Sequence, residues 1–395
     1  MNANSTNYDV IIAGGGPAGA SAAIHLAKRG TRVLLVETKK FPRPKLCGEF
    51  ISPECAVHFE RLGVADEMRA AHPAALIGTV FYSRGGKSVR VPSSWFASAG
   101  VALGLSRAEM DERLLRRAAA AGADVLEEAH ATNVIVDNNA VCGVSVKHGL
   151  RETTYRAAVT IDATGRNQTL TRKLNKRPAR HEPRPMVAFK AHFETTKIEP
   201  GACEIYFYRG GYGGLSSIEN GLSNLCFIAF ARDVRACDAD ADRVMREVVC
   251  QNRRAALTLE HARLNSPWLA VSLEGFGRTS VAPRNGLLAI GDAASFIDPF
   301  TGSGMLMALQ SGELAAQTIG DFLDQKMNAL DALRNAYTTR YHQAFHSRLR
   351  LCSWLRRAAF VPGLAAAAIH IFDSSDAMRR RLAQATRGGA ETSTV

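Results

Sequence analysis

The segment Asp9-Val-Ile-Ile-Ala-Gly14-Gly-Gly16-Pro-Ala-Gly19 decides the fold of this 395-residue chain. A short apolar strand enters a Gly-x-Gly-x-x-Gly turn, a helix is expected over 17–29, and a second apolar strand ends at Glu37. In such a turn Gly14 allows the tight bend, Gly16 lets the backbone approach a pyrophosphate, and Gly19 lets the helix pack against the strand. The pattern predicts an α/β strand–helix–strand unit that binds an adenine dinucleotide.

The helix after this turn is expected to hold the phosphates of the dinucleotide. Its first turn starts at Pro17 and Ala18, and the free N–H groups and the positive end of the helix dipole point toward the glycines. Glu37 is placed to accept hydrogen bonds from a pair of ribose hydroxyls. The residues predicted to bind at this end are Gly14, Gly16, Pro17, Ala18, Gly19 and Glu37.

Composition indicates a soluble globular protein with more than one domain. Apolar residues make up 46% and charged residues 22% of the chain, which is typical of folded proteins with real cores. The net charge of +12 owes much to arginines near the C-terminus, among them Arg350 and Arg380. These suit a solvated helix face, or a contact with an anionic membrane or acidic partner. No nucleic-acid-binding module is recognisable, so nucleic acid is not an expected partner.

The eight cysteines contain no C-x-x-C pair, which argues against an iron–sulfur cluster, a zinc ribbon or a dithiol redox pair. His342 and His346 are four residues apart but lack a third ligand motif, so no metal site is expected. The first residues do not resemble a secretory signal, and no apolar run is long enough to span a bilayer. A cytoplasmic protein, at most peripheral to a membrane, is therefore expected.

Changes of pattern along the chain predict two domains and a helical end. The dinucleotide-binding domain is expected to be discontinuous, over 1–80, 101–182 and 272–335. Residues 183–271 follow a basic, proline-rich connector and are expected to form an antiparallel β-sheet domain. Residues 336–395 are expected to be helical.

Two further elements are assigned to the second domain. A hairpin within 76–100 is expected to join its sheet, and a helix over about 239–257 is expected to pack against it. Tyr206, Tyr208 and Tyr212 either line a substrate cavity or pack as ordinary strand residues. This domain is expected to bind the substrate.

A second glycine-rich segment, far along the chain, narrows the choice of dinucleotide. An apolar strand ends at Gly291 and Asp292, and the segment 299–304 precedes a helix expected over 305–323. Ligands sit beyond the carboxyl ends of parallel strands, so two helix N-termini can hold two ends of one long ligand. The second N-terminus suits an anion-forming ring such as reduced flavin. The residues predicted at this end are Gly291, Asp292, Pro299, Gly302, Ser303 and Gly304.

Together these motifs resemble those of the FAD-dependent oxidoreductases of the para-hydroxybenzoate hydroxylase superfamily, and within it the geranylgeranyl reductase-like branch. The resemblance also rests on Cys47-Gly48-Glu49, on Ser106-Arg107 before a helix with Asp111, and on Asp162-Ala-Thr-Gly165. It implies a Rossmann-like FAD-binding domain with a mixed sheet and an α+β second domain. It also implies that Arg107 contacts the pyrophosphate or ribityl region and that Asp162 is one of the cofactor-binding residues. Arg107 also suits the N-terminal end of a surface helix, and Asp162 also suits a strand end.

The resemblance implies FAD as the cofactor, with NAD(P)H as a transient reductant, because no second Gly-x-Gly-x-x-Gly unit with flanking strand and helix is present. The expected reaction is reduction of a C=C bond in a hydrophobic, isoprenoid-like or polyketide-like substrate. The alternative is hydroxylation or epoxidation through a flavin hydroperoxide. A non-catalytic flavin carrier is less favoured, as is a halogenase, whose Trp-x-Trp-x-Ile-Pro segment is absent.

Three segments leave alternatives open. Cys47 is expected either to shape the cavity and relay a proton or to be a small buried apolar residue. Glu49 suits a loop-holding role or a catalytic one. Gly211-Tyr-Gly is followed by Gly214-Leu-Ser instead of the tryptophan and proline usual in the branch, which puts polyprenyl specificity in doubt. The apolar segment 358–372 suits a packing helix, a subunit contact or a monotopic membrane contact.

Overall fold

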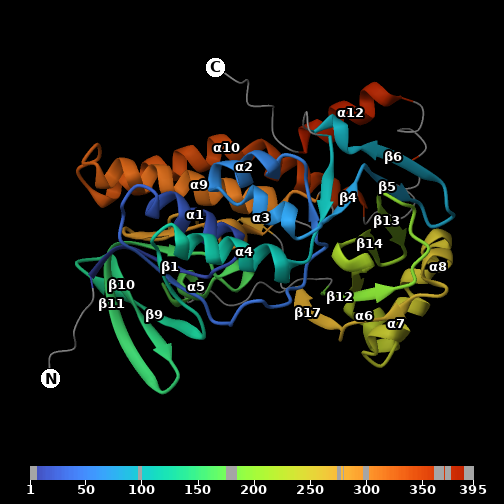
Figure 1. Ribbon diagram of the computed structural model, residues 1–395, viewed down its shortest axis with the longest axis horizontal. Helices are drawn as coiled ribbons and strands as arrows, with labels where there is room; N and C mark the ends of the chain where they lie inside the picture. The colour runs from blue at the N-terminus through green and yellow to red at the C-terminus, as the bar shows by residue number, and fades with distance from the viewer. Residues whose placement is uncertain are drawn as a thin grey trace.

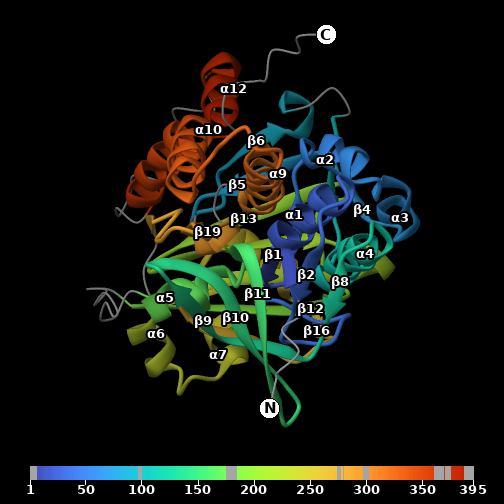
Figure 2. The ribbon, with the colours of Figure 1, turned by 90° about the vertical axis from the view of Figure 1, so that its left-hand side faces the viewer.

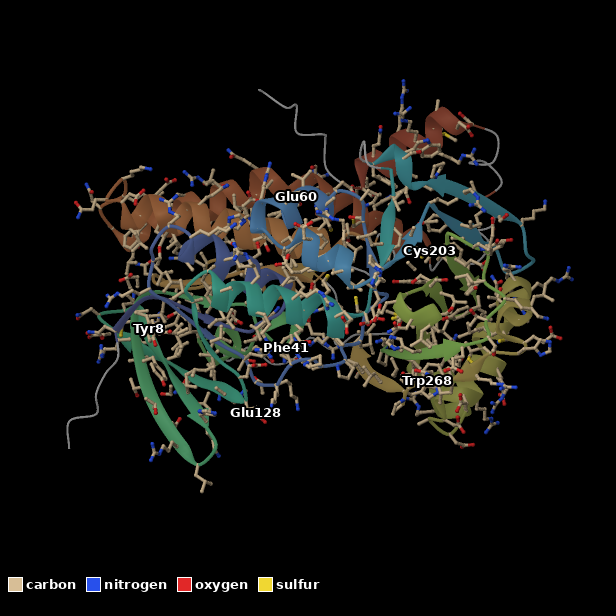
Figure 3. All side chains as sticks on the ribbon, viewed as in Figure 1. Tyr8, Phe41, Glu60, Glu128, Cys203 and Trp268 are labelled. Atoms are coloured by element: carbon tan, nitrogen blue, oxygen red, sulfur yellow. The ribbon has the colours of Figure 1, made fainter. Side chains whose placement is uncertain are left out.

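The computed structural model describes residues 7–96, 100–174, 185–273, 277–278, 280–296, 302–359, 369 and 375–386. These residues build two sheet-containing domains, seen on the left and right of Figure 1, with long helices over the first. The labelled Tyr8 and Glu128 lie in the first domain, and Cys203 and Trp268 lie in the second (Figure 3).

In the described part of the chain, the first sheet has the strand order β8-β2-β1-β11-β10-β9, and β19 also pairs with β11. Its core is parallel, because β1 pairs in parallel with β2 and β11, while β10 runs antiparallel to β9 and β11. The mixed sheet of the expected Rossmann-like fold is thus confirmed. The strands are β1 (Asn7–Ala13), β2 (Val33–Val36), β8 (Asp124–Leu126), β9 (Ala129–Asp137), β10 (Ala140–His148), β11 (Arg151–Asp162) and β19 (Leu287–Ala289).

Both faces of this sheet are apolar, as a sheet covered on two sides requires. Val10 and Ile12 point into the core beneath the helices, whereas Ile11 and Ala13 point into the core on the opposite face. Figure 2 shows α1, α4 and α9 over one face, with α10 beside α9. The helices of this domain are α1 (Pro17–Ala27), α2 (Cys55–Leu62), α3 (Ala65–Ala70), α4 (Arg107–Ala120), α5 (Thr169–Leu174), α9 (Gly304–Leu323) and α10 (Leu330–Ala359).

Within the described residues, the second sheet has the order β16-β12-β15-β14-β13-β5-β6, with β17 also paired to β12. Neighbouring strands are antiparallel except β13 and β5, so the hairpin expected within 76–100 joins this sheet through a parallel pair. The strands are β5 (Gly78–Tyr82), β6 (Ser88–Pro92), β12 (Met186–Glu194), β13 (Ala202–Tyr208), β14 (Gly211–Ser217), β15 (Ser223–Phe230), β16 (Arg263–Leu264) and β17 (Leu269–Leu273).

The single helix expected over 239–257 is wrong, because the structure has two helices, α7 (Ala241–Glu247) and α8 (Arg253–Leu259). Asn252 separates them. Its Oδ1 accepts hydrogen bonds from the first N–H groups of α8, and its Nδ2 donates to three carbonyls, including that of Tyr82 at 3.1 Å. This fully buried amide caps one helix and ties it to the sheet, so the chain cannot continue helically through it.

Short elements connect the two domains. Strands β3 (Phe50–Ile51), β4 (Ala74–Leu76) and β7 (Ala102–Gly104) form a small sheet in the order β3-β7-β4. β18 (Gly277–Arg278) pairs with β20 (Ser295–Phe296), and α6 (Ala231–Ala236) follows β15. Helix α12 (Asp376–Ala385) packs against β6.

Two expectations for the C-terminal part can be compared with the structure only partly. Residues 336–395 contain the end of α10 and all of α12, but most of the apolar segment 358–372 lies outside the described residues. Among the helices that are described, none combines the length and the apolar character needed to cross a bilayer.

Candidate functional site

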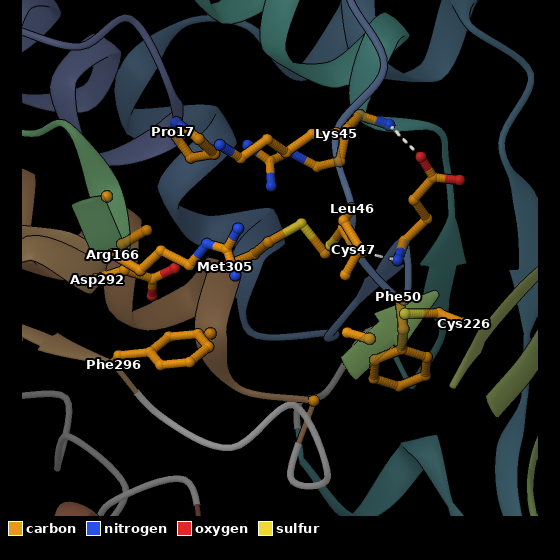
Figure 4. A pocket seen from close by; sticks show the side chains of 18 of the residues that line it. Pro17, Lys45, Leu46, Cys47, Phe50, Arg166, Cys226, Asp292, Phe296 and Met305 are labelled. Carbon is orange, nitrogen blue, oxygen red and sulfur yellow. Dashed lines mark hydrogen bonds between the residues drawn. The ribbon is translucent and has the colours of Figure 1, made fainter. Parts of the chain in front are cut away.

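A cavity of about 850 Å³ is lined by residues of both domains. One part is bordered by the turn after β1, the loop 43–50 and the start of α4. The other part is bordered by the second sheet and by residues of α12, including Leu382. Figure 4 shows this cavity from close by, with Lys45, Cys47, Asp292 and Met305 among its labelled side chains.

The glycines after β1 form a cradle that opens toward the cavity. Gly14 has φ +110°, and a Cβ there would lie 2.3 Å from the carbonyl oxygen of Ala163. A Cβ at Gly19 would lie 1.9 Å from the oxygen of Gly14, so helix α1 can approach the turn only with glycine. Among the described residues, a Cβ at Gly16 would come within 4 Å of Nη2 of Arg107 alone, at 3.9 Å, because Gly16 faces the cavity. Pro17 and Ala18 of α1 also line it.

Glu37 lies at the end of β2 and borders the cavity beside this cradle. Its Oε2 accepts a hydrogen bond from the N–H of Gly15 at 2.8 Å, and its Oε1 accepts one from the N–H of Lys39 at 2.9 Å. The carboxylate is almost fully buried and borders the cavity, where a pair of ligand hydroxyls could donate to it.

The cationic side chains that line the cavity next to the cradle include Arg43, Lys45, Arg107 and Arg166. Sequence reasoning predicted only Arg107. The surrounding walls desolvate the ammonium of Lys45 and lower its pKa, and repulsion from the three arginines lowers it further. Asp292, predicted from the strand end, faces the same group, and its burial raises its pKa despite the neighbouring Arg107, Lys45 and Arg166. This surplus of positive charge suits a diphosphate.

Arg107 is held by Asp111, one turn further along α4. Nε donates to Oδ1 at 2.7 Å and Nη2 to Oδ2 at 2.6 Å. Burial alone would lower the pKa of Arg107, but the fully buried carboxylate of Asp111 outweighs it and raises that pKa. Nη1 of Arg43 lies 3.4 Å from the same carboxylate and has no hydrogen-bond partner among the described residues. Arg43 is therefore a second guanidinium with donors left for a ligand.

The second glycine-rich segment borders the cavity from the other side. Gly291, Gly302 and Gly304 line it, together with Met305 at the start of α9. The side chain of Ser303 is buried and is not part of the wall. Gly291 has φ +57°, and its N–H donates to Oγ of Ser311 in α9 at 2.9 Å. Pro299, predicted to bind at this end, lies outside the described residues.

Asp162 does not line the cavity, and the structure corrects its predicted role. Its Oδ1 accepts from the N–H and the hydroxyl of Thr164, and its Oδ2 accepts from the N–H of Thr171. The carboxylate is fully buried by these contacts, which close the turn after β11. The wall at this point comes from the residues after it, including Gly165 and Arg166.

The loop Cys47-Gly48-Glu49 borders the cavity and contacts both β15 of the second sheet and the start of α4. The carbonyl of Cys47 accepts a hydrogen bond from Nδ2 of Asn224 on β15 at 3.1 Å, and Sγ accepts one from the N–H of Glu49 at 3.4 Å. The thiol also interacts with the guanidinium of Arg107. Cys47 is half-buried and faces the cavity, as Figure 4 shows.

Glu49 is fully buried, and sequence reasoning missed its two side-chain partners. Its Oε1 lies 2.8 Å from Nζ of Lys190, and its Oε2 lies 2.7 Å from Nε2 of His192. Burial by itself raises the pKa of Glu49, but the bond to His192 and the charge of Lys190 outweigh burial, so that pKa is lowered. The available signal was a lysine and a histidine two residues apart in the otherwise apolar run 186–193.

The second sheet supplies a mostly apolar wall. Tyr212 lines the cavity, but the prediction that Tyr206 and Tyr208 line it is wrong. Side chains alternate along β13, so Cys203, Ile205 and Phe207 face the cavity, while the two tyrosines lie in the core beneath α7 and α8. Burial raises the pKa of the Cys203 thiol to about 12, which keeps it neutral as part of an apolar wall.

His342 and His346 lie on α10 with ring centroids 6.3 Å apart. In the part of the chain that the structure describes, no group of three or more His, Cys, Asp or Glu side chains is arranged to hold a metal ion.

Comparison with known proteins identifies the family. A family model described as an FAD binding domain matches residues 7–347. A menaquinone reductase of Mycobacterium tuberculosis is 30% identical over 373 residues, covering 90% of this chain and 85% of that protein. A digeranylgeranylglycerophospholipid reductase of Thermoplasma volcanium is 28% identical over 324 residues, covering 78% of this chain and 77% of that protein.

Solved structures show the same fold. A geranylgeranyl bacteriochlorophyll reductase-like protein from Thermoplasma acidophilum has a TM-score of 0.77 at 22% identity, covering 98% of this chain and 97% of that one. A flavin-dependent brominase has a TM-score of 0.79, also at 22% identity, covering 96% of this chain and 94% of that one. At this level of identity, these two comparisons establish the fold alone.

The cavity fits FAD. The glycine cradle and α1 suit its ADP half, with Glu37 at the ribose and Arg43, Lys45 and Arg107 at the diphosphate. Nη1 of Arg43, which has no hydrogen-bond partner among the described residues, and the open face of Gly16 leave a donor and space where the diphosphate would lie. Because the family model covers most of the chain, the protein belongs to the FAD binding domain family and is an FAD-dependent oxidoreductase.

Proposed function

We propose that this oxidoreductase takes electrons from NAD(P)H and uses them to saturate a C=C bond of an apolar, isoprenoid-bearing substrate. The observation that carries the proposal is the continuity of the cavity, whose wall passes from the cradle at Gly16 to the sheet residues Ile205 and Ile228. FAD, when bound, supplies the two-electron chemistry. The chain supplies binding, orientation and exclusion of water.

The wall beyond the loop 47–49 favours a long apolar substrate over a small polar one. Phe81, Val91 and Phe207 belong to it, and so do Leu355 of α10 and Leu382 of α12. Burying such side chains together with an apolar ligand is favourable by about 25 cal/mol per Å² of apolar surface removed from water. The similar proteins named as menaquinone and digeranylgeranylglycerophospholipid reductases point to the same substrate class.

NAD(P)H would act as a transient reductant. The sequence holds one strand–Gly-x-Gly-x-x-Gly–helix unit, and its glycines Gly14 and Gly16 face the cavity assigned to FAD. A nicotinamide cofactor would therefore approach through the same cavity and leave before the substrate reacts.

We also propose that the protein draws its substrate from an anionic membrane surface. Trp354, 65% exposed, follows the exposed Arg350 on α10, and the exposed Arg380 and Arg381 lie on α12. Leu355 and Leu382, next to these residues in sequence, line the cavity. Basic side chains and a tryptophan beside apolar residues that line the cavity suit the interface between lipid headgroups and acyl chains.

Turnover with and without oxygen tests the proposed reaction. Purified holoprotein would be incubated with NADH or NADPH and a polyprenyl-bearing quinone or lipid, and the product examined by mass spectrometry. Reduction predicts a gain of two hydrogen atoms that persists under nitrogen. A product that gains an oxygen atom, and forms only in air, would instead establish a monooxygenase. If no polyprenyl substrate yields either product, the proposed substrate class is contradicted.

A further inference from the structure

One buried carboxylate joins three separate parts of the chain beside the cavity. Oε1 of Glu49 accepts hydrogen bonds from Nζ of Lys190 at 2.8 Å and from the backbone N–H of Arg107 at 2.9 Å. Oε2 pairs with Nε2 of His192 at 2.7 Å. Lys190 and His192 belong to β12 of the second sheet, whereas Arg107 begins α4 of the first domain.

The backbone of Glu49 is tied to the cavity wall as firmly as its side chain. Its N–H donates to Sγ of Cys47, and its carbonyl accepts from the N–H of Leu105 at 3.2 Å. Glu49 has φ +53°, a conformation that non-glycine residues adopt only when the surrounding structure holds them there. The contacts of the Glu49 carboxylate stabilise this conformation, so the position of the Cys47 loop depends on them.

A second carboxylate fastens the same end of α4. Oε2 of Glu219, in the turn between β14 and β15, accepts from the N–H of Ser106 at 2.8 Å. Ser106 is the N-cap of α4, so successive N–H groups before and at Arg107 are bound to carboxylates. These bonds fix the start of α4, and with it the guanidinium of Arg107, relative to the second domain.

We propose that Glu49 is a positioning residue that couples the substrate-lined sheet to Cys47 and Arg107 in the cofactor half of the cavity. Its carboxylate is engaged by Lys190, His192 and α4, so it acts through these neighbours. Buried charges of this kind are costly to desolvate and contribute little net stability, which favours a role in fixing geometry. The inference rests on the proposed use of the cavity for FAD and substrate.

The test compares two fully buried glutamates, Glu49 in the loop before β3 and Glu204 on β13. Glu49→Gln removes the negative charge that faces Nζ of Lys190 and Nε2 of His192. Glu204→Gln is the matched control, because Glu204 is also fully buried and paired with Arg254 at 2.7 Å, but it faces away from the cavity. Both holoproteins would be assayed for the alkylation rate of Cys47 by iodoacetamide, resolved by peptide mass spectrometry, and for the FAD dissociation constant.

Glu49→Gln is expected to raise the Cys47 alkylation rate about tenfold and to weaken FAD binding by a similar factor, the size of effect that loss of one charged hydrogen bond produces. Glu204→Gln is expected to leave both unchanged even where it lowers the melting temperature equally. Equal effects of the two substitutions, or none from Glu49→Gln, would overturn the proposal. Neither readout requires turnover, so failure here is distinguishable from failure of the proposed reaction.

A milder substitution covers the case in which Glu49→Gln does not fold. His192→Asn removes the imidazole that faces Oε2 of Glu49 and leaves the other partner, Lys190, in place. The half-buried site of His192 tolerates a smaller side chain better than the buried site of Glu49 does. His192→Asn is expected to raise the alkylation rate of Cys47, but by a smaller factor than Glu49→Gln does. An unchanged rate would contradict the coupling.

Discussion

Asp111 holds the guanidinium of Arg107 by two parallel hydrogen bonds, of 2.7 and 2.6 Å, from one turn away on α4. Such paired contacts fix a guanidinium in direction as well as in position. Arg107 is therefore presented to the cavity in one orientation before any ligand arrives.

Asp111→Asn should weaken FAD binding about tenfold or more, because one of the two contacts is lost and Arg107 can turn away from the diphosphate. Equilibrium titration of the FAD-free protein, followed by flavin fluorescence, would measure this. Glu109→Gln is the control, since Glu109 pairs with Arg113 at the same spacing on the exposed side of α4. Equal affinities for the two variants would contradict the role given to Asp111.

Gly19→Ala should prevent formation of the cradle. Its Cβ would lie 1.9 Å from the oxygen of Gly14, so α1 must move away from β1, at a cost of about 2 kcal/mol or more in the free energy of unfolding. Urea denaturation and the flavin content after purification would show it. Gly85→Ala, where no atom of the described residues lies within 4 Å of the added Cβ, should change neither the stability nor the flavin content. A Gly19→Ala protein with normal flavin content would refute the cradle.

Gly214→Leu should block the substrate half of the cavity while sparing the cofactor half. Gly214 lines the cavity from β14, and a Cβ there already approaches Cδ1 of Ile205 to 3.0 Å. We expect the KM for a polyprenyl substrate to rise about tenfold, while flavin content and reduction by NAD(P)H stay unchanged as internal controls. A fall in flavin content with an unchanged KM would place the substrate elsewhere.

The stability of the helical layer should depend on pH through Glu313 of α9. Burial by itself raises the pKa of Glu313, but the hydrogen bond to His58, at 3.0 Å, and the nearby charges outweigh burial and lower it. A lowered carboxyl pKa stabilises the fold above the unfolded value, and that stabilisation is lost as the pH falls through the folded pKa.

Glu313→Gln should therefore cost about 1–3 kcal/mol in the free energy of unfolding at pH 7, and the difference from wild type should shrink below about pH 4.5. Glu60→Gln, which alters an exposed ion pair, should cost little at either pH. Urea denaturation at both pH values measures the difference. A difference in the free energy of unfolding that stays constant with pH would contradict a lowered pKa of Glu313.

The cofactor half of the site was predictable because its geometry is local. Gly14 and Gly19 are five residues apart and meet in one turn, so their spacing alone encodes the close approach that the structure shows. The fold class, predicted from such motifs, and FAD, which the family resemblance implied, are confirmed by the structure and the family match.

The substrate half depends on pairings that no local pattern encodes. Glu49 meets Lys190 and His192 across more than a hundred residues of chain, so only the folded sheet brings them together. The wrong prediction for Tyr206 and Tyr208 has a similar origin. The sequence indicates that side chains of β13 alternate between two faces of the sheet, but it does not indicate which face borders the cavity.

The central claim, that flavin and apolar substrate react within one cavity, is tested most directly by a single turnover without oxygen. Holoprotein whose FAD has been chemically reduced would be mixed with a polyprenyl substrate, and flavin absorption and product would be followed together. The account predicts reoxidation of the flavin, with one C=C bond saturated for each flavin reoxidised. Flavin that stays reduced until air is admitted would contradict it.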